Sequence, residues 1–225
     1  MKQLSPKLRS FFFVCIFIFI ATSSVKAEGE GSEIRLLAFG DSLIHGYGLE
    51  RNATFPAQLE ATLRQRGWNV VVINGGNSGD TTAAGLQRLD WSLQDKPDGV
   101  LVELGANDAL RGLDPELARK NLDLILRRLE EEGLPTLLIG MHAPRNLGED
   151  YARAFDAIFP ELAETHSVSL YPFFLEGVAL QPNLNQPDGI HPNKEGVGEI
   201  VERILPHVED LLSKVAEKRL GKVTN

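Results

Sequence analysis

The chain has 225 residues, of which 43% are hydrophobic, so it is long enough for one α/β domain with a buried core. Its net charge of −8 argues against nucleic acid or an anionic membrane as a standing partner. The single cysteine, Cys15, lies in an N-terminal apolar stretch. The rest of the chain therefore has no disulfide, no cysteine nucleophile and no zinc site built on cysteine.

The first 27 residues have the three-part organisation of a secretory signal peptide. A basic segment, residues 2–9, precedes 11 consecutive apolar residues at 11–21, and Val25-Lys26-Ala27 resembles a cleavage site. A membrane-spanning helix needs about 20 apolar residues. We therefore expect cleavage after Ala27 rather than an uncleaved anchor. The prediction is an exported domain, residues 28–225, that is periplasmic or secreted and has no stable membrane anchor.

Residues 1–27 hold four basic side chains and no acidic one, so cleavage would leave 19 basic and 31 acidic residues and a net charge of −12. No repeat or low-complexity segment follows the signal peptide. We expect a monomer whose partner is a small-molecule ester substrate.

Strand-like and helix-like segments alternate after residue 33. Short apolar runs predict strands at 34–39, 70–73, 100–104, 134–139 and 168–171. Helical spacing and terminal Pro or Gly residues predict helices at 55–67, 81–93, 115–133, 151–165 and 194–214. This alternation predicts a one-domain, three-layer α/β/α fold of the flavodoxin-like type, with about five parallel strands covered on both faces.

Ligands of such folds bind beyond the carboxyl ends of the strands, so the residues that follow each strand are the candidates for chemistry. Phe-Gly-Asp-Ser-Leu at 39–43 follows the first strand and places Ser42 on the turn into a helix. A glycine-rich block at 74–81 follows the second strand, and 103–108 covers the end of the third. Asp-Gly-Ile-His-Pro at 188–192 lies just before the last helix.

In this order, these blocks resemble the motifs of the SGNH hydrolase family, also called GDSL hydrolases. The matching motifs are Phe-Gly-Asp-Ser-Leu at 39–43, Asn-Ser-Gly-Asp-Thr at 77–81, Gly-x-Asn-Asp at 105–108 and Asp-x-x-His at 188–191. The resemblance covers nearly all of the chain after residue 27. Within the family, the segments 101–112 and 188–193 look closest to the secreted arylesterases and the periplasmic thioesterase/lysophospholipase group.

The resemblance implies that Ser42 is a nucleophile, that His191 is its base and that Asp188 orients His191. It also implies an oxyanion hole formed by the backbone N–H groups of Ser42 and Gly79 and the side-chain amide of Asn107. The chemistry is consistent with these residue types. A serine hydroxyl needs a base within reach, imidazole titrates near neutrality, and a nearby carboxylate fixes the imidazole tautomer.

Each motif alone has a plainer interpretation. Gly, Asp and Ser are ordinary turn residues, so Ser42 alone could be a turn serine, and His191 could simply lie at the start of a helix. Four blocks in family order favour the functional interpretation. Asp41, Asp80 and Asp108 are expected to organise loops rather than to act as acids.

No histidine has neighbours that suit a metal ion, and no phosphate-binding glycine motif follows a strand, so the sequence predicts no metal and no cofactor. An apolar groove for a fatty acyl or aryl group is expected after the third and fourth strands. Its candidate residues are Leu110, Leu113, Met141, Pro144 and Leu147. Some of these could instead pack only in the core.

The predicted reaction is acyl transfer to water through a serine ester intermediate. The expected substrates are small carboxylic esters, aryl esters, acyl thioesters or lysophospholipids. A carbohydrate O-acetylesterase is one alternative and would have a small polar pocket. A catalytically silent glycan- or lipid-binding protein is another, although its signature would be loss of the serine or histidine. Acyl transfer to an alcohol would require water to be kept out.

Overall fold

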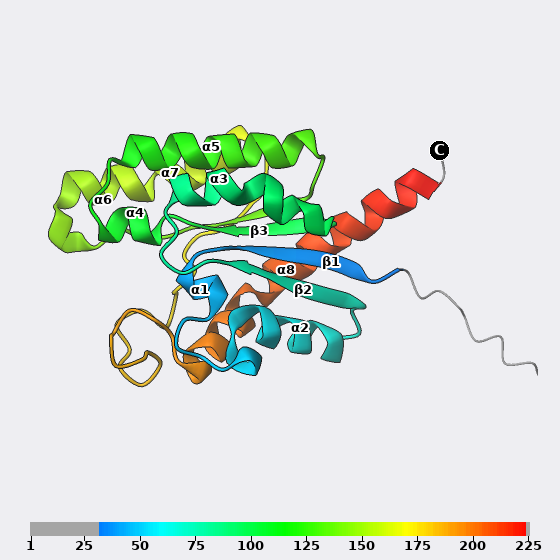
Figure 1. The fold of residues 1–225 in the computed structure, drawn as a ribbon, viewed down its shortest axis with the longest axis horizontal. Helices are drawn as coiled ribbons and strands as arrows, with labels where there is room; N and C mark the ends of the chain where they lie inside the picture. The colour runs from blue at the N-terminus through cyan, green and yellow to red at the C-terminus, as the bar shows by residue number, and fades with distance from the viewer. Residues whose placement is uncertain (1–31, 224–225) are drawn as a thin grey trace, which may run out of the picture. The chain divides into compact units, whose positions relative to one another are not determined.

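The computed structural model describes residues 32–223 (Figure 1). The predicted signal peptide, residues 1–27, lies outside the described residues. Within 32–223, no helix is both long and apolar enough to span a bilayer.

Five parallel strands form one sheet in the order β2-β1-β3-β4-β5. Their bounds are Ile34–Gly40 for β1, Val70–Gly76 for β2, Gly99–Glu103 for β3, Thr136–Ile139 for β4 and Ser169–Tyr171 for β5. This is the flavodoxin-like order, in which the chain leaves β1 for one edge and then crosses back to the other side. The structure thereby confirms the predicted fold class.

Helices cover both faces of the sheet. Figure 1 shows α3 and α5 on one face and α2 and α8 on the other. The helices are α1 Ser42–His45, α2 Phe55–Gln65, α3 Thr82–Ser92, α4 Ala106–Leu110, α5 Pro115–Glu131, α6 Glu149–Asp156, α7 Ile158–Thr165 and α8 Lys194–Val223. Short 3-10 turns lie at η1 Arg51–Ala53, η2 Leu93–Asp95 and η3 Arg145–Leu147.

The core lies between these layers and explains the apolar strand sequences. All five residues of β3 are buried, and six of the seven in β1 are. A parallel strand covered on both faces has no solvent side, so it carries a continuous apolar run instead of an alternating one.

Three predicted elements differ from the structure. The single helix expected at 151–165 is two helices, α6 and α7. Pro160 has no N–H to donate to the carbonyl of Asp156, and its ring would collide with that carbonyl, so the first helix ends there. The last helix continues to Val223 instead of ending near 214, and β2 extends to Gly76 instead of ending at residue 73.

Two short helices follow directly on central strands, and the sequence patterns predicted no residue range for either. Helix α1 begins at Ser42 after β1, and α4 begins at Ala106 after β3. With four and five residues, neither is long enough to show an apolar repeat in the sequence.

Replacing Leu101 by alanine tests the packing of the central strand. Leu101 is completely buried in β3, so Leu101→Ala should lower the free energy of unfolding by about 2–5 kcal/mol. Leu117→Ala is the matched control, because Leu117 lies on α5 with 59% of its surface exposed. In urea unfolding, the free energy of unfolding of the control should change by less than about 0.5 kcal/mol. Equal losses for the two variants would contradict the assigned layers.

Candidate active site

The site lies where the strand order reverses. Strand β1 has β2 on one side and β3 on the other, and the carboxyl ends of all three meet at one edge. Gly40 pairs with Gly76 of β2 and with Glu103 of β3. Ser42 and Asn107 follow two of these ends, so the topology brings them to the crevice where open α/β sheets bind ligands.

Ser42 occupies the first position of α1, directly after a tight turn. Asp41 caps this helix, because its Oδ1 accepts the N–H of Leu43 at 3.0 Å. The residue before Asp41, Gly40, has to be a glycine. A Cβ there would lie 2.4 Å from Ile44 Cγ1 and 2.5 Å from the Glu103 carbonyl oxygen. Only glycine lets the strand, the turn and β3 approach this closely.

Ser42, His191 and Asp188 form a continuous hydrogen-bonded chain. His191 Nε2 lies 3.0 Å from Ser42 Oγ, and His191 Nδ1 lies 2.7 Å from Asp188 Oδ2. With Nδ1–H donating to the carboxylate, Nε2 is left to accept the serine proton. The ring of Tyr47 packs on the imidazole with 4.7 Å between centroids, which further restrains its orientation.

The loop before α8 holds Asp188 in place. Its Oδ1 accepts the backbone N–H groups of Ile190 at 3.0 Å and of His191 at 3.1 Å. Burial raises the pKa of Asp188, but these two bonds and the one from the imidazole outweigh burial and lower the pKa to about 2. Asp188 therefore remains a carboxylate throughout the neutral range.

The loop that carries Gly79 is attached to the end of β1. Gly79 has a φ of +86°, a left-handed conformation that favours glycine. The N–H of Asn77 donates to the Gly40 carbonyl at 3.0 Å. Arg88 donates to the same carbonyl at 2.8 Å and pairs with Asp80 at 2.5 Å. These contacts attach the loop of Gly79 to the strand end two residues before Ser42.

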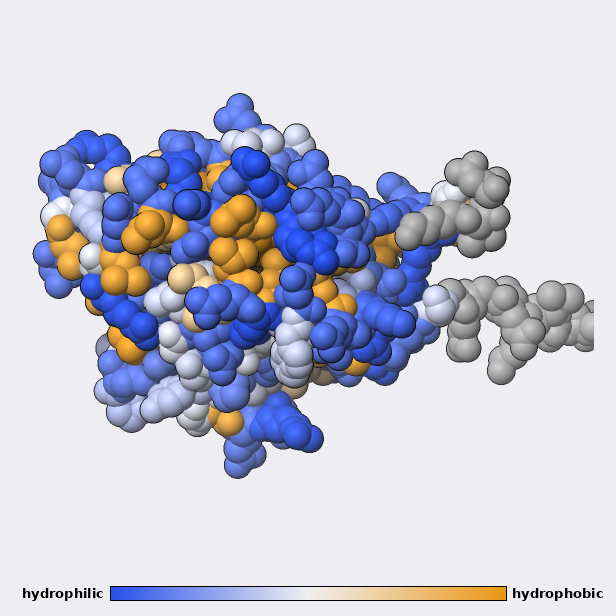
Figure 2. All heavy atoms as spheres, turned by 45° about the horizontal axis from the view of Figure 1, so that its top comes forward, coloured by the Kyte–Doolittle hydropathy of each residue, from blue (hydrophilic) through white to orange (hydrophobic). Residues whose placement is uncertain are grey.

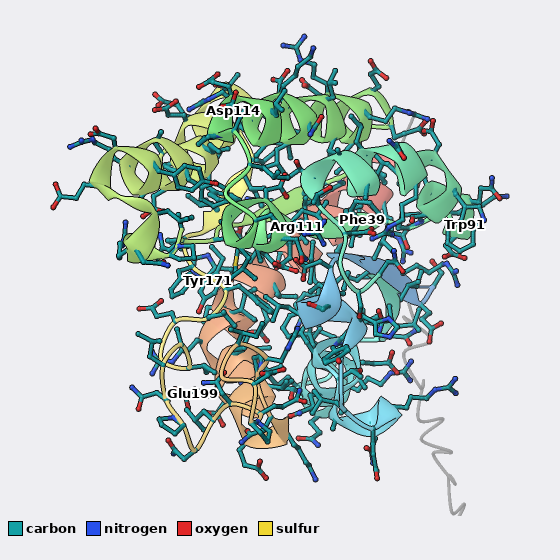
Figure 3. The ribbon with its side chains drawn as sticks, turned by 60° about the vertical axis from the view of Figure 1, so that its left-hand side comes forward. Phe39, Trp91, Arg111, Asp114, Tyr171 and Glu199 are labelled. Atoms are coloured by element: carbon teal, nitrogen blue, oxygen red, sulfur yellow. The ribbon has the colours of Figure 1, made fainter. Side chains whose placement is uncertain are left out.

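Asn107 lies at the second position of α4. Its Nδ2 donates to Asp41 Oδ2 at 3.0 Å, so the residue before Ser42 holds its side chain. Arg111, which ends α4, reaches across to donate to the Gly79 carbonyl at 2.9 Å. Figure 3 brings this edge of the sheet forward, with Arg111 and Phe39 labelled. The three elements that carry Ser42, Gly79 and Asn107 are thus tied to one another.

Several residues of this cluster were not singled out in the sequence. Arg88 and Tyr47 gave no signal, because their roles depend on contacts between distant segments. Glu103 had a weak signal in the sequence, because it is a charged residue close to the end of an otherwise apolar run that predicts a strand. Asp41, Asp80 and Asp108 organise loops as expected. Asp108, for example, accepts the N–H and the hydroxyl of Thr82 at 2.8 and 2.7 Å.

The five predicted pocket residues fall into two groups. Leu110, Leu113 and Leu147 are 52%, 39% and 37% exposed, whereas Met141 is buried in the core and Pro144 is half-buried. Met141 therefore fits the alternative of core packing.

The exposed group lies together. A Cβ on Gly112 would come within 3.9 Å of the Leu147 side chain, which places the loop of Leu110 and Leu113 beside Leu147. The hydroxyl of Tyr151 ties this loop to α6 by donating to the Leu113 carbonyl at 2.7 Å. Figure 2, turned to bring α3 and α5 forward, shows hydrophobic side chains exposed on this side of the molecule.

A separate groove of about 640 Å³ lies on the far side of α1 and includes none of these residues or the Ser42 chain. It is lined by residues of α1, η1, α2 and β2, including His45, Leu49, Thr54, Pro56 and Asn74. The imidazole of His45 lies at its rim and contacts the Gly76 carbonyl at 3.3 Å. Across residues 32–223, no group of three or more His, Cys, Asp or Glu side chains is arranged to hold a metal ion.

Comparisons with known proteins show the family of the chain. The family model described as GDSL-like lipase/acylhydrolase matches residues 38–197. An arylesterase of Vibrio mimicus is 41% identical over 179 residues, which are 79% of this chain and 89% of that protein. The thioesterase 1/protease 1/lysophospholipase L1 of Escherichia coli is 37% identical over 198 residues, covering 88% and 92% of the two chains. The solved structure of AlinE4, an SGNH-hydrolase family esterase, is 51% identical with a TM-score of 0.69, covering 81% of this chain and 98% of that one.

The fold and these relatives define a carboxylic ester hydrolase of the SGNH type. The chain belongs to the GDSL-like lipase/acylhydrolase family, and the resemblance predicted from its four motifs is confirmed.

Replacing Asp188 by asparagine tests the depressed pKa. A carboxyl group whose pKa falls from 3.8 to about 2 on folding stabilises the fold above about pH 4, and this contribution is lost as the pH drops toward 2. The melting temperature of Asp188→Asn should therefore lie below that of the wild type at neutral pH, with a gap that narrows below pH 4 and closes near pH 2. A gap that stays constant across pH would show that the carboxylate charge is not what stabilises the loop.

Proposed function

We propose that Ser42 is the nucleophile, His191 its general base and Asp188 the orienting carboxylate of an ester hydrolase that works through an acyl-enzyme. The observation that carries this proposal is the chain of contacts from Ser42 Oγ to His191 Nε2 at 3.0 Å and from His191 Nδ1 to Asp188 at 2.7 Å. A nucleophile within reach of a base that a third group orients is the arrangement that activates serine.

The reaction follows from these positions. As Ser42 Oγ attacks the acyl carbon, its proton passes to His191 Nε2 and the carbonyl oxygen becomes an oxyanion. The backbone N–H groups of Ser42 and Gly79 and the Nδ2 of Asn107 supply the donors for that charge. The imidazolium then gives its proton to the leaving alcohol, phenol or thiol. Water then attacks the acyl carbon of the acyl-enzyme and gives a proton to His191. The imidazolium returns this proton to Ser42 Oγ as the bond between Oγ and the acyl carbon breaks, which releases the carboxylic acid and restores the serine.

The substrates that we propose are aryl and acyl esters, acyl thioesters and lysophospholipids. The relatives are described as arylesterase, esterase, and thioesterase with lysophospholipase. The exposed group of Leu110, Leu113 and Leu147 offers an apolar rim for an acyl or aryl group. A sugar acetylesterase would need small polar surroundings, so this rim disfavours it. The intact Ser42–His191 pair disfavours a silent binding protein.

We further propose that the protein is exported after removal of residues 1–27, that it is a monomer and that it needs no cofactor. The basic segment, the short apolar run and the Val25-Lys26-Ala27 sequence support export.

Hydrolysis of p-nitrophenyl esters from acetate to palmitate by protein lacking residues 1–27 tests the nucleophile and the acyl preference. Medium-chain esters should be cleaved fastest, and Ser42→Ala should lower kcat at least about 10³-fold, because the nucleophile is removed. Ser213→Ala is the control, since Ser213 is an exposed serine on α8 whose hydroxyl bonds within its own helix.

Activity that survives Ser42→Ala would overturn the assignment of the nucleophile. Activity confined to acetate would favour the sugar acetylesterase instead, and absence of activity on every ester would favour the binding protein.

Expression of the full chain in a Gram-negative host tests export. The expected product begins at Glu28 and appears in the periplasm or the medium. A membrane-bound product that retains residue 1 would show that the N-terminal segment is an uncleaved anchor.

A further inference from the structure

Two buried carboxyl groups lie directly behind the oxyanion hole. Asp41 and Glu103 are both 0% exposed, and they end up together because Gly40 and Glu103 are paired across β1 and β3. The backbone N–H of Asp41 lies 3.5 Å from Glu103 Oε2, so the two carboxyl groups are buried neighbours. A Cβ at Gly40 would lie 2.8 Å from Glu103 Oε2, so glycine makes room for this contact.

Such a pair cannot carry two charges. No Lys or Arg pairs with either carboxyl among the described residues, and two ionised carboxylates in contact repel one another. Burial raises the pKa of Glu103 well above its usual range, and the negative charge of Asp41 raises it further. Glu103 is therefore the protonated partner, and its O–H donates to the Asp41 carboxylate.

The second oxygen of Glu103 agrees with this assignment. Within residues 32–223, Glu103 Oε1 is buried and has no hydrogen-bond partner. Burying an oxygen without a hydrogen bond costs far less free energy on a neutral carboxylic acid than on an ionised carboxylate.

Asp41 has the stronger support for the charge. Burial raises the pKa of Asp41 to about 6, because the hydrogen bonds that it accepts from the N–H of Leu43 and from Nδ2 of Asn107, both at 3.0 Å, offset burial only in part. Asp41 is therefore the carboxyl group of the pair that ionises first. An ionised carboxylate can only accept hydrogen bonds. It therefore fixes which way the Asn107 amide faces, because a flipped amide would present its oxygen to the charge.

We propose that Asp41 and Glu103 share one proton and act as positioning residues, with Asp41 holding Asn107 so that its remaining amide N–H points at the oxyanion. This inference rests on the proposed function, since it presupposes that Asn107 is an oxyanion donor. The single proton serves the reaction, because a second negative charge behind the oxyanion would oppose its formation.

A double-mutant cycle on the p-nitrophenyl ester reaction tests the link between Asp41 and Asn107. Asp41→Asn should lower kcat roughly tenfold or more with little change in KM. Complete loss of an oxyanion donor lowers kcat by ~10²- to 10³-fold, and a donor that is only misplaced should cost a part of that. In an Asn107→Ala background the same substitution should cost less than about threefold, because the group it positions is already gone. Equal losses in both backgrounds would overturn the inference.

Glu103 provides the conservative control. Glu103→Gln keeps a neutral donor toward Asp41 and should retain kcat within about threefold, whereas Glu103→Leu has no donor and should lose activity as Asp41→Asn does. If the Gln and Leu variants lost activity equally, the shared proton would be wrong. Should Asp41→Asn fail to fold, the Glu103→Leu and Asn107→Ala pair gives the same cycle.

The result also separates this inference from the proposed function. If Ser42→Ala retains activity, the proposed function itself fails. If Ser42 is required but the cycle is additive, only the role of Asp41 and Glu103 is contradicted.

Discussion

Three segments meet at Gly40 and leave no room for a side chain there. They are the end of β1, the turn that bears Ser42 and the end of β3. A Cβ would be 2.4 Å from Ile44 and 2.5 Å from the Glu103 carbonyl oxygen. The Gly40 carbonyl also accepts hydrogen bonds from Asn77 and Arg88. Gly40 thereby sets the distances among the turn that carries Ser42, the loop of Gly79 and the strand that leads to Asn107. Catalysis by oriented donors requires such fixed distances, since a misplaced donor contributes little to the transition state.

Charge is distributed around this point according to burial. Asp188, the proposed orienting carboxylate, is partly exposed and accepts three hydrogen bonds, so its pKa is low. The carboxyl groups behind the proposed oxyanion hole, Asp41 and Glu103, are buried neighbours, so they hold fewer charges than two free carboxylates would. Arg88 neutralises Asp80 and stacks on Phe39 at 4.3 Å, so its charge reinforces the loop.

The sheet was predictable because each buried strand is a short apolar run bounded by turn residues. The candidate site was predictable because three of the four motifs follow strands and the fourth precedes the last helix, all in family order, and the structure brings Ser42, His191 and Asp188 into contact. The bounds of helices α1 and α4 were not predictable, since both helices are too short for a periodic pattern. The split at Pro160 had a visible signal, a proline inside the helical pattern.

The contacts among Asp41, Glu103 and Asn107 were beyond sequence reasoning for a different reason. They depend on the register of β1 against β3, which pairs Gly40 with Glu103, and a register between distant segments leaves no local pattern. The exposure of the predicted pocket residues likewise left no pattern in the sequence. Met141 and Leu147 are both apolar residues that follow β4, and only the path of the chain past η3 buries the first and exposes the second.

The central claim is that Ser42 forms the covalent intermediate. Its most direct test is inactivation of the protein lacking residues 1–27 with an ethyl p-nitrophenyl phosphonate, followed by peptide mapping in a mass spectrometer. We expect a single phosphonyl adduct on Ser42 that stops the hydrolysis of esters, and the rate of its formation should fall strongly in His191→Ala. An adduct on any other residue, or continued ester hydrolysis by fully labelled protein, would contradict it.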